Sequence, residues 1–166
     1  MQKTDDFTDF VDNDEMDAPA RDYIPTRSLQ RDDLRAVVRI DERTTGVNRQ
    51  EYYERIFEEV LDESGIRVSL VAEIDEHVAG FIMARVDYGE FGRTDSTAVI
   101  DIFGVDPRYQ GEGVGSALMS QLVTNLTGLR IEATRTNVEW NDFPVLAYLE
   151  ACGFKTSQRL VFAKKL

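Results

Sequence analysis

The sequence has few of the residues that form covalent cross-links or metal centres. It holds one cysteine, Cys152, and one histidine, His77, in 166 residues. A single cysteine cannot form an internal disulfide, and it excludes zinc sites built from several cysteines. Long hydrophobic runs are also missing, because no stretch approaches the ~18 apolar residues of a membrane-spanning helix. We therefore expect a chain with no disulfide, no metal site and no partner in the membrane.

Positive charge is scarce, since 19 Lys and Arg face 31 Asp and Glu and the net charge is -12. Such a surface disfavours nucleic acid as a partner and attracts basic molecules. Residues 1–22 carry half of this excess and show no sustained hydrophobic period. They predict a disordered acidic tail, with a docking peptide as the alternative. The first residues lack a basic region followed by an apolar stretch, so we expect no secretion signal and a cytoplasmic location.

Residues 23–166 have the length of one domain, because a single core typically occupies ~100 to 200 residues. Their hydrophobic periodicity alternates between the repeats of helices and strands. Two β-rich runs, 68–74 and 78–86, are separated by a hairpin-length turn and should pair antiparallel. The other predicted elements are a strand at 23–29, helices at 32–43 and 49–63, a strand at 97–105, a helix at 114–128 capped by Gly128, a strand at 129–134, a helix at 143–151 and a strand at 160–164.

A glycine cluster lies between the predicted strand 97–105 and the predicted helix 114–128. It reads Gln110-Gly111-Glu112-Gly113-Val114-Gly115-Ser116. Glycines permit backbone conformations that other residues resist, and they let N–H groups approach an anion closely. Because the helix that follows adds the positive end of its dipole, the segment predicts a phosphate or pyrophosphate site.

Two common phosphate-binding motifs do not fit this cluster. A P-loop requires Gly-Lys-Ser/Thr at its end, and that sequence is absent. A dinucleotide-binding turn reads G-x-G-x-x-G, whereas here the third glycine comes one position early and Ser116 occupies its place. Too few residues follow the cluster to complete a doubly wound sheet.

The chain resembles the GNAT superfamily of N-acetyltransferases at this point. The family's central motif, [Q/R]-x-x-G-x-[G/A] after a strand that ends in apolar-x-Val-x-Pro, is matched by Gln110 to Gly115 after Phe103-Gly104-Val105-Asp106-Pro107. A second motif, an asparagine followed by an apolar helix that ends in Gly-Phe, is matched by residues 141–154. The resemblance implies an α/β (α+β) fold with a mixed, mostly antiparallel sheet of six to seven strands and about four helices.

The resemblance also implies acetyl-CoA as cosubstrate and indicates where it binds. The pyrophosphate would lie on the backbone N–H groups of the glycine cluster, with Gln110 shaping the loop. Phe103, Gly104 and Val105 would pair with the pantetheine arm as if it were another strand, and the Val105 N–H would point at the thioester oxygen. The coenzyme-binding residues expected by resemblance are Phe103, Gly104, Val105, Gln110, Gly111, Glu112, Gly113, Val114, Gly115, Ser116 and Asn141.

Acyl transfer to an amine requires a base, because an ammonium group is not a nucleophile. Asp101 lies four residues before Val105, where some relatives carry a catalytic glutamate. It is a candidate base, acting directly or through water. A carboxylate hydrogen-bonded near the open end of the sheet is the alternative interpretation.

The candidate acid departs from the family pattern. Relatives place a tyrosine four residues before the glycine of Gly-Phe, but that position is Leu149 here and Tyr148 lies one residue earlier. One residue rotates a helical side chain by ~100°. A shifted helix start would return Tyr148 to the site, and otherwise solvent would protonate the leaving thiolate. The asparagine is shifted by one residue as well, which places Asp142 in the family's position.

The acceptor is not readable from the sequence beyond its being an amine. Tyr88 and Glu90 occupy the loop that borders the acceptor site in this fold, and they are candidate substrate contacts. Trp140 and Glu139 are alternative residues of the acceptor-site wall, and core packing is the preferred interpretation for Trp140. The predicted function is N-acetyl transfer to a small-molecule or protein amine, and the alternative is a non-catalytic module that binds acyl-CoA. The sequence leaves a homodimer open.

Overall fold

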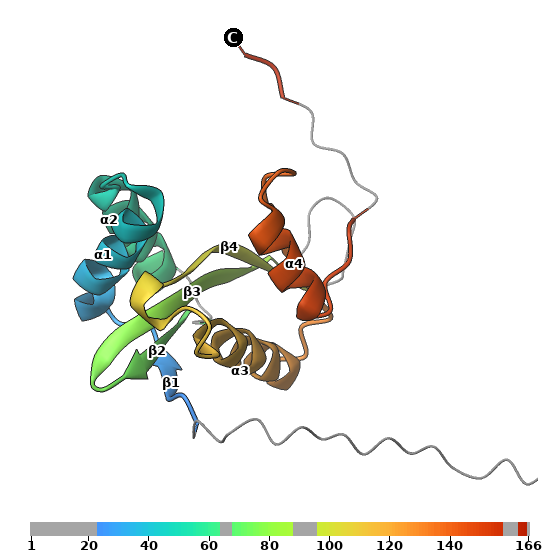
Figure 1. Cartoon of the computed structure of the whole chain (residues 1–166). Helices are drawn as coiled ribbons and strands as arrows, with labels where there is room; N and C mark the ends of the chain where they lie inside the picture. The colour runs from blue at the N-terminus through green and yellow to red at the C-terminus, as the bar shows by residue number, and fades with distance from the viewer. Residues whose placement is uncertain (1–22, 64–67, 88–95, 158–162, 166) are drawn as a thin grey trace, which may run out of the picture.

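A computed structural model describes residues 23–63, 68–87, 96–157 and 163–165 of the chain (Figure 1). It contains a five-stranded sheet flanked by four α-helices. The elements are β1 (Thr26–Ser28), α1 (Leu34–Thr45), α2 (Gln50–Glu58), β2 (Leu70–Ile74), β3 (His77–Asp87), β4 (Thr97–Val105), α3 (Val114–Gly128), β5 (Ala133–Thr136) and α4 (Phe143–Ala151). Short 3-10 helices span 31–33 and 107–109, and a π-helical turn at 59–63 extends α2.

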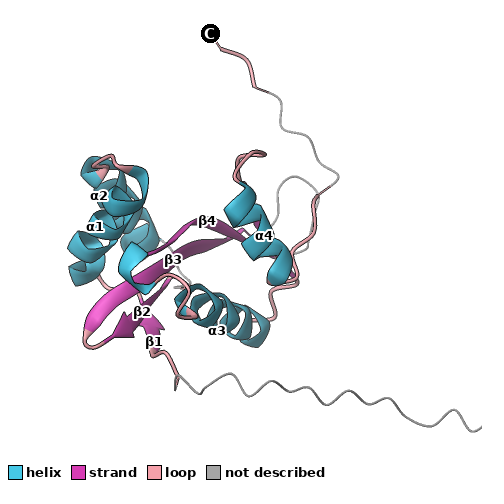
Figure 2. Cartoon of the chain, viewed as in Figure 1, coloured by secondary structure: helices cyan, strands magenta, loops and turns pink. Residues whose placement is uncertain are grey.

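The strands lie in the order β1-β2-β3-β4-β5. All neighbouring pairs are antiparallel except β4 and β5, which run parallel. Helices α1 and α2 cover one face of the sheet and α3 and α4 the other (Figures 1 and 2). One hydrophobic cluster lies under each helix pair, so both faces of β3 are buried over most of the strand. This mixed α/β architecture confirms the predicted fold class.

The sequence patterns explain several of these elements. The predicted apolar face of α3 is buried, with Val114, Leu118 and Leu122 each at most 2% exposed. Asp75 and Glu76 form the β2–β3 turn with φ of 50° and 62°. Two consecutive residues with positive φ form the type of two-residue turn whose twist matches that of an antiparallel hairpin. The antiparallel register of β2 and β3, from Leu70 with Ile82 to Ile74 with His77, confirms the predicted pairing.

The structure corrects the strand predicted at 129–134, because β5 begins only at Ala133. Leu129 is 46% exposed, and Arg130 adopts a left-handed φ of 58° that turns the chain after α3. The alternating Leu129 and Ile131 belong to this turn, in which the Ile131 N–H donates to the Leu126 carbonyl over 3.0 Å. Gly128 ends α3 as predicted but is not the left-handed residue.

The remaining differences concern the ends of the sheet. The first strand is shorter than predicted, covering Thr26–Ser28 of the expected 23–29. The strand predicted at 160–164 falls mainly outside the described residues, and 163–165 have no regular structure. The described part of the chain thus shows five strands where six to seven were predicted.

A β-bulge interrupts β4 at Asp101. Met83 pairs with Ile102 and the next residue, Ala84, pairs with Ile100, so Asp101 is an extra residue with no partner on β3. A bulge reverses the alternation of side chains between the two faces. The residues of β4 that pack with the α3 and α4 cluster are accordingly Ala98 and Ile100 before the bulge and Phe103 and Val105 after it.

Candidate active site

The parallel strands β4 and β5 separate in the middle of β4. Their pairing runs from Thr97 with Ala133 to Ile100 with Thr136. The Thr136 hydroxyl donates to the Ile100 carbonyl over 3.0 Å at the last pair. Beyond it β4 continues for five residues to Val105, and no described strand lies on that side.

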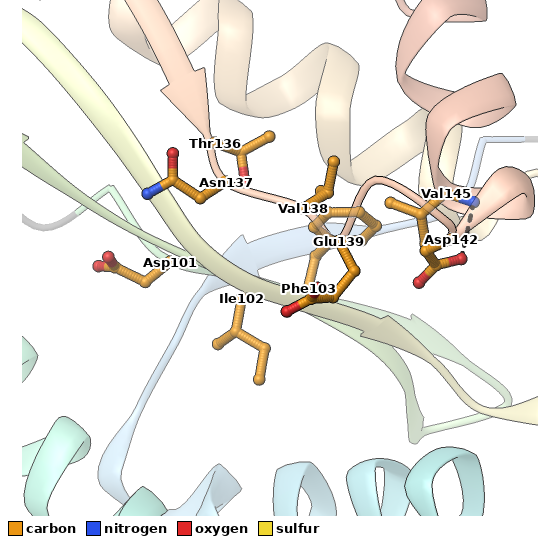
Figure 3. Close-up of a pocket in the computed structure, with 9 residues that line it drawn as sticks. All are labelled: Asp101, Ile102, Phe103, Thr136, Asn137, Val138, Glu139, Asp142 and Val145. Atoms are coloured by element: carbon orange, nitrogen blue, oxygen red, sulfur yellow. Dashed lines mark hydrogen bonds between the residues drawn. The ribbon is translucent and has the colours of Figure 1, made fainter. Parts of the chain in front are cut away.

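A cavity of about 240 Å³ occupies this opening (Figure 3). Its walls come from the second half of β4, from the end of β5 and the residues that follow it, and from the start of α4. In Figure 3, Ile102 points away from Phe103, which lies beside Val138 and Glu139. The lining residues are Asp101, Ile102, Phe103, Thr136, Asn137, Val138, Glu139, Asp142 and Val145.

The backbone of β4 presents hydrogen-bonding groups to the opening. The Asp106 N–H donates to the Ala79 carbonyl over 2.8 Å, which fixes the direction of the backbone at the end of β4. Backbone groups alternate between the two sides of an antiparallel strand. Those of Gly104 therefore face β3, and those of Phe103 and Val105 face the opening. An extended ligand arm laid along β4 would meet these two residues.

The glycine cluster forms a tight loop between β4 and α3. Gly111 and Gly113 have left-handed φ of 78° and 87°, which favour glycine strongly. The first backbone bond of α3 is donated by the Ala117 N–H to the Gly113 carbonyl over 2.9 Å. The N–H groups ahead of that bond have no acceptor within the helix, as at every helix N-terminus, and they can bind an anion. They belong to Val114, Gly115 and Ser116.

Tyr148 reaches this loop from α4. Its hydroxyl donates to the Gly115 carbonyl over 2.7 Å, and its ring centroid lies 5.6 Å from that of Phe103. A Cβ atom at Gly115 would lie 3.3 Å from the Tyr148 ring, so the missing side chain allows this approach. Burial raises the pKa of Tyr148 above its usual range and keeps the hydroxyl protonated. The one-residue shift in sequence therefore does not carry Tyr148 away from the loop.

Asp101 projects from the bulge and lines the cavity, whereas Tyr148 and the glycine loop are not among its lining residues. Its side chain is 29% exposed, and its Oδ1 lies 3.4 Å from Nη1 of Arg85. Burial raises the pKa of Asp101 and the Arg85 guanidinium lowers it, while the carboxylates of Asp87 and Glu59 raise it further. The net direction is upward, which suits a carboxylate that must accept a proton.

Asp106 follows β4 and holds the start of the loop through its side chain. The sequence did not predict it as a site residue. Asp106 is fully buried and accepts hydrogen bonds from Nη1 of Arg43 over 2.7 Å and Nη2 of Arg108 over 2.9 Å. The hydrogen bonds from Arg108 lower the pKa of Asp106 to about 2. Its signal was the following Pro107, because an aspartate before a proline is typical of the start of a helical turn.

Of the two polar residues that begin the second motif, Asp142 lines the cavity and Asn141 does not. Asn141 is exposed in the turn before α4 and does not line the cavity. Asp142 lines it, and its Oδ1 accepts a hydrogen bond from the Val145 N–H over 3.3 Å at the start of α4. The interpretation of Trp140 as a core residue is wrong, because its side chain is 79% exposed.

The remaining candidates lie outside the cavity or outside the described residues. Gln110 is exposed beside the loop, and Cys152 is partly buried against the core. Tyr88 and Glu90, the predicted acceptor contacts, lie in a segment that the structure does not describe. Among the described residues, no group of three or more His, Cys, Asp or Glu side chains could hold a metal ion.

A comparison with models of known protein families identifies the family of this chain. The model of the acetyltransferase (GNAT) family matches residues 33–154. The chain belongs to the GNAT family. As a member it is an N-acetyltransferase with acetyl-CoA as cosubstrate, as the sequence predicted. Among the described residues, no helix combines the length and the apolar character needed to cross a membrane.

Individual relatives agree with this assignment. The chain is 33% identical to aminoglycoside N(6')-acetyltransferase type 1 of Stenotrophomonas maltophilia over 113 residues, which is 66% of this chain and 72% of the relative. It is 29% identical to the mycothiol acetyltransferase of a Nocardioides species over 107 residues, 61% of this chain, and spans only 36% of that relative. The fold matches aminoglycoside N-acetyltransferase AAC(6')-Iy, solved with CoA, at a TM-score of 0.72, with 17% identity and 89% and 97% of the two chains covered.

Proposed function

We propose that this GNAT chain transfers the acetyl group of acetyl-CoA to a primary amine of a small-molecule or protein acceptor by direct attack. The observation that carries the proposal is the opening between β4 and β5, which has the glycine loop and Tyr148 at one end and Asp101 at the other. An open strand edge that leads to an anion site suits a ligand with an amide-containing arm and a pyrophosphate.

The coenzyme fits the groups that the chain presents. The N–H groups of residues 111–116 would hold the pyrophosphate, with Gln110 at the loop's edge, and the open backbone groups of Phe103 and Val105 would pair with the pantetheine arm. Bound acetyl-CoA supplies an activated thioester. The Val105 N–H would then stabilise the negative charge that develops on the thioester oxygen. Asn141 stays a predicted coenzyme contact.

The acid and base follow from the positions of Asp101 and Tyr148. Asp101 would take a proton from the acceptor's ammonium group, directly or through water, and free the amine for attack. As the new C–N bond forms and the C–S bond breaks, Tyr148 would donate its proton to the leaving sulfur, and the proton that the attacking nitrogen loses would restore the tyrosine hydroxyl through solvent. Its hydroxyl would have to turn from the Gly115 carbonyl, which it contacts in this structure. No covalent intermediate on the protein is required.

The names of two similar proteins support an amine as the acceptor. The relative that is 33% identical is named for acetylating an amino group of aminoglycosides. AAC(6')-Iy was also solved with a bisubstrate analogue of CoA and acetylneamine. Tyr88 and Glu90 stay predicted acceptor contacts, and the cytoplasmic location and a homodimer stay predictions.

Calorimetric titration with acetyl-CoA, followed by thiol release against a panel of amines, tests the proposal. We expect binding and amine-dependent release of CoA. Binding without release from any amine would favour the alternative of a non-catalytic acyl-CoA module. Absence of binding would overturn the assignment of the site.

A pair of glycine variants tests the loop itself. Gly111 and Gly46 have nearly equal left-handed φ, 78° and 74°, and a Cβ atom at either would meet nothing within 4 Å. Alanine should therefore add a similar strain of about 1–2 kcal/mol at both positions. We expect only Gly111→Ala to weaken binding of acetyl-CoA, because only there would the methyl group meet the pyrophosphate. Equal affinity in both variants would refute the pyrophosphate site.

A further inference from the structure

Four charged side chains form a row beside the catalytic opening, across three strands. Arg85 and Asp87 come from β3, Asp101 from β4 and Arg135 from β5. Nη1 of Arg85 lies 3.4 Å from Oδ1 of Asp101, and its Nε lies 4.0 Å from Oδ1 of Asp87. Nη2 of Arg135 lies 3.2 Å from Oδ2 of Asp87. The candidate base is therefore one member of a mixed-charge row.

The strand register places this row on the face of the sheet that α1 and α2 cover. Val99 pairs with Arg85 on one side and with Arg135 on the other, so the three side chains share one face. Phe81 and Met83, which share the face of Arg85 on β3, pack in the cluster under α1 and α2. The row extends this face beyond the hydrophobic cluster. Phe103, which flanks the coenzyme edge, packs with the cluster on the opposite face.

The ion pairs of the row are loose and accessible to solvent. The Arg85 side chain is 46% exposed and that of Arg135 is 42% exposed. By contrast, Arg43 approaches the fully buried carboxylate of Asp106 to 2.7 Å. Exposed pairs at the longer distances contribute little to folding, on the order of 0–1 kcal/mol each. A ligand can therefore open the contact between Arg85 and Asp101 at small cost.

The charges of the row restrict which amine can bind there. An ammonium group placed on Asp101 would lie beside the Arg85 guanidinium, which repels it, and near the carboxylates of Asp87 and Glu59, which attract it. An acceptor that also carries a carboxylate would exchange one ion pair for two, with its amine on Asp101 and its carboxylate on Arg85. A guanidinium has five donors in a fixed fork that matches a carboxylate, and Arg85 uses only one of them on Asp101.

We propose that the acceptor of this enzyme is a small primary amine that carries a carboxylate within a few bonds of the amine, as amino acids do, and that Arg85 binds the carboxylate. This inference rests on the proposed function and names the substrate class of the same site. It separates this chain from a polyamine-specific enzyme, in which carboxylates alone would surround the acceptor.

Thiol release measured with matched acceptors tests the inference. Each of the common amino acids would be compared with its own carboxamide, which keeps the amine and removes the negative charge. Neamine and spermidine would represent amines without a carboxylate. A charge-assisted hydrogen bond to a carboxylate predicts a preference of roughly 10- to 100-fold in kcat/KM for an amino acid over its amide.

Variants of Arg85 attribute the preference to this residue. Arg85→Gln should lower kcat/KM for the amino acid to that for the amide and leave acetyl-CoA affinity unchanged, and Arg85→Lys should restore part of the difference. Arg39→Gln, the same change at an exposed arginine of α1, should have no effect.

Three results would overturn the inference. One is efficient turnover of neamine or spermidine with no preference for the carboxylate. Another is a preference that survives Arg85→Gln. The third is turnover of no amino acid; the proposed function would still stand if another amine released CoA, and it would fail with the inference only if no amine did.

Discussion

Replacing Tyr148 by phenylalanine should separate the structural role of this side chain from its proposed role as the acid. The change removes one hydroxyl and keeps the ring, so the contact with Phe103 at 5.6 Å stays. The hydrogen bond to the Gly115 carbonyl, 2.7 Å long, is lost. An intramolecular hydrogen bond contributes about 1 kcal/mol net to stability. For a domain of this size, that corresponds to a fall of about 2–4 °C in Tm.

The catalytic expectation for the same variant is much larger. A positioned general acid contributes typically 10²- to 10⁴-fold to rate, so kcat should fall by roughly that factor. The KM for acetyl-CoA should change little, because the loop N–H groups and the edge of β4 are untouched. Burial raises the pKa of Tyr148 above its usual value of about 10, so the hydroxyl stays protonated at neutral pH.

The assays are thermal unfolding and the pH dependence of kcat. Tyr23→Phe, at a side chain that is 81% exposed, is the control for loss of a hydroxyl and should change neither quantity. A lowered Tm with an unchanged kcat would refute the assignment of Tyr148 as the acid. It would leave solvent as the proton donor to the leaving sulfur.

Two further predictions follow from the carboxylates beside the opening. Asp101→Asn should lower kcat by roughly 10²- to 10⁴-fold and leave acetyl-CoA affinity unchanged, with Asp75→Asn in the exposed hairpin turn as control. Because burial raises the pKa of Asp101, kcat/KM of the parent should fall on acidification at a pH above the ordinary value for aspartate, and an identical acid limb in the variant would contradict its role as the base. Asp106→Asn should destabilise the fold by about 2 kcal/mol at neutral pH, measured by urea unfolding, because the group that accepts hydrogen bonds from two arginines loses its negative charge. The pKa of Asp106 is lowered to about 2, so its contribution is present above pH ~4 and disappears as the pH falls toward 2; a difference between parent and variant that persists at pH 2 would refute this origin.

The elements that depend on local pattern could be predicted from the sequence. The β2–β3 hairpin, the buried face of α3 and the glycine loop each depend on residues close together in the chain. The left-handed Gly113 occupies the position where the motif requires glycine, and the left-handed Gly111 follows Gln110 at a position that the motif leaves open. The short reach of these interactions explains why periodicity and motif spacing were sufficient.

The bulge at Asp101 could not be predicted, because both faces of β4 are apolar around it. Apolar residues stand on both sides of Asp101, Ile100 before it and Ile102 and Phe103 after it. The hydrophobic pattern is therefore the same whether or not Asp101 is counted in the alternation of side chains. Only the pairing of Met83 with Ile102 and Ala84 with Ile100 reveals the extra residue. The position of Tyr148 against Gly115 was equally hidden, since it depends on how α4 packs on α3.

The two halves of the site differ in how they are encoded, and this limits what relatives can tell about the acceptor. The proposed coenzyme half consists mainly of backbone groups in a contiguous loop and strand, so members of the family can share it through one motif. The proposed acceptor half includes Arg85, Asp101 and Arg135, which come together only through the register of three strands. An identity of 33% to an aminoglycoside acetyltransferase therefore supports the cosubstrate and the reaction. In the proposed site, binding of an amine with or without a carboxylate depends on single side chains such as Arg85, which can change while the family's motif and fold stay the same.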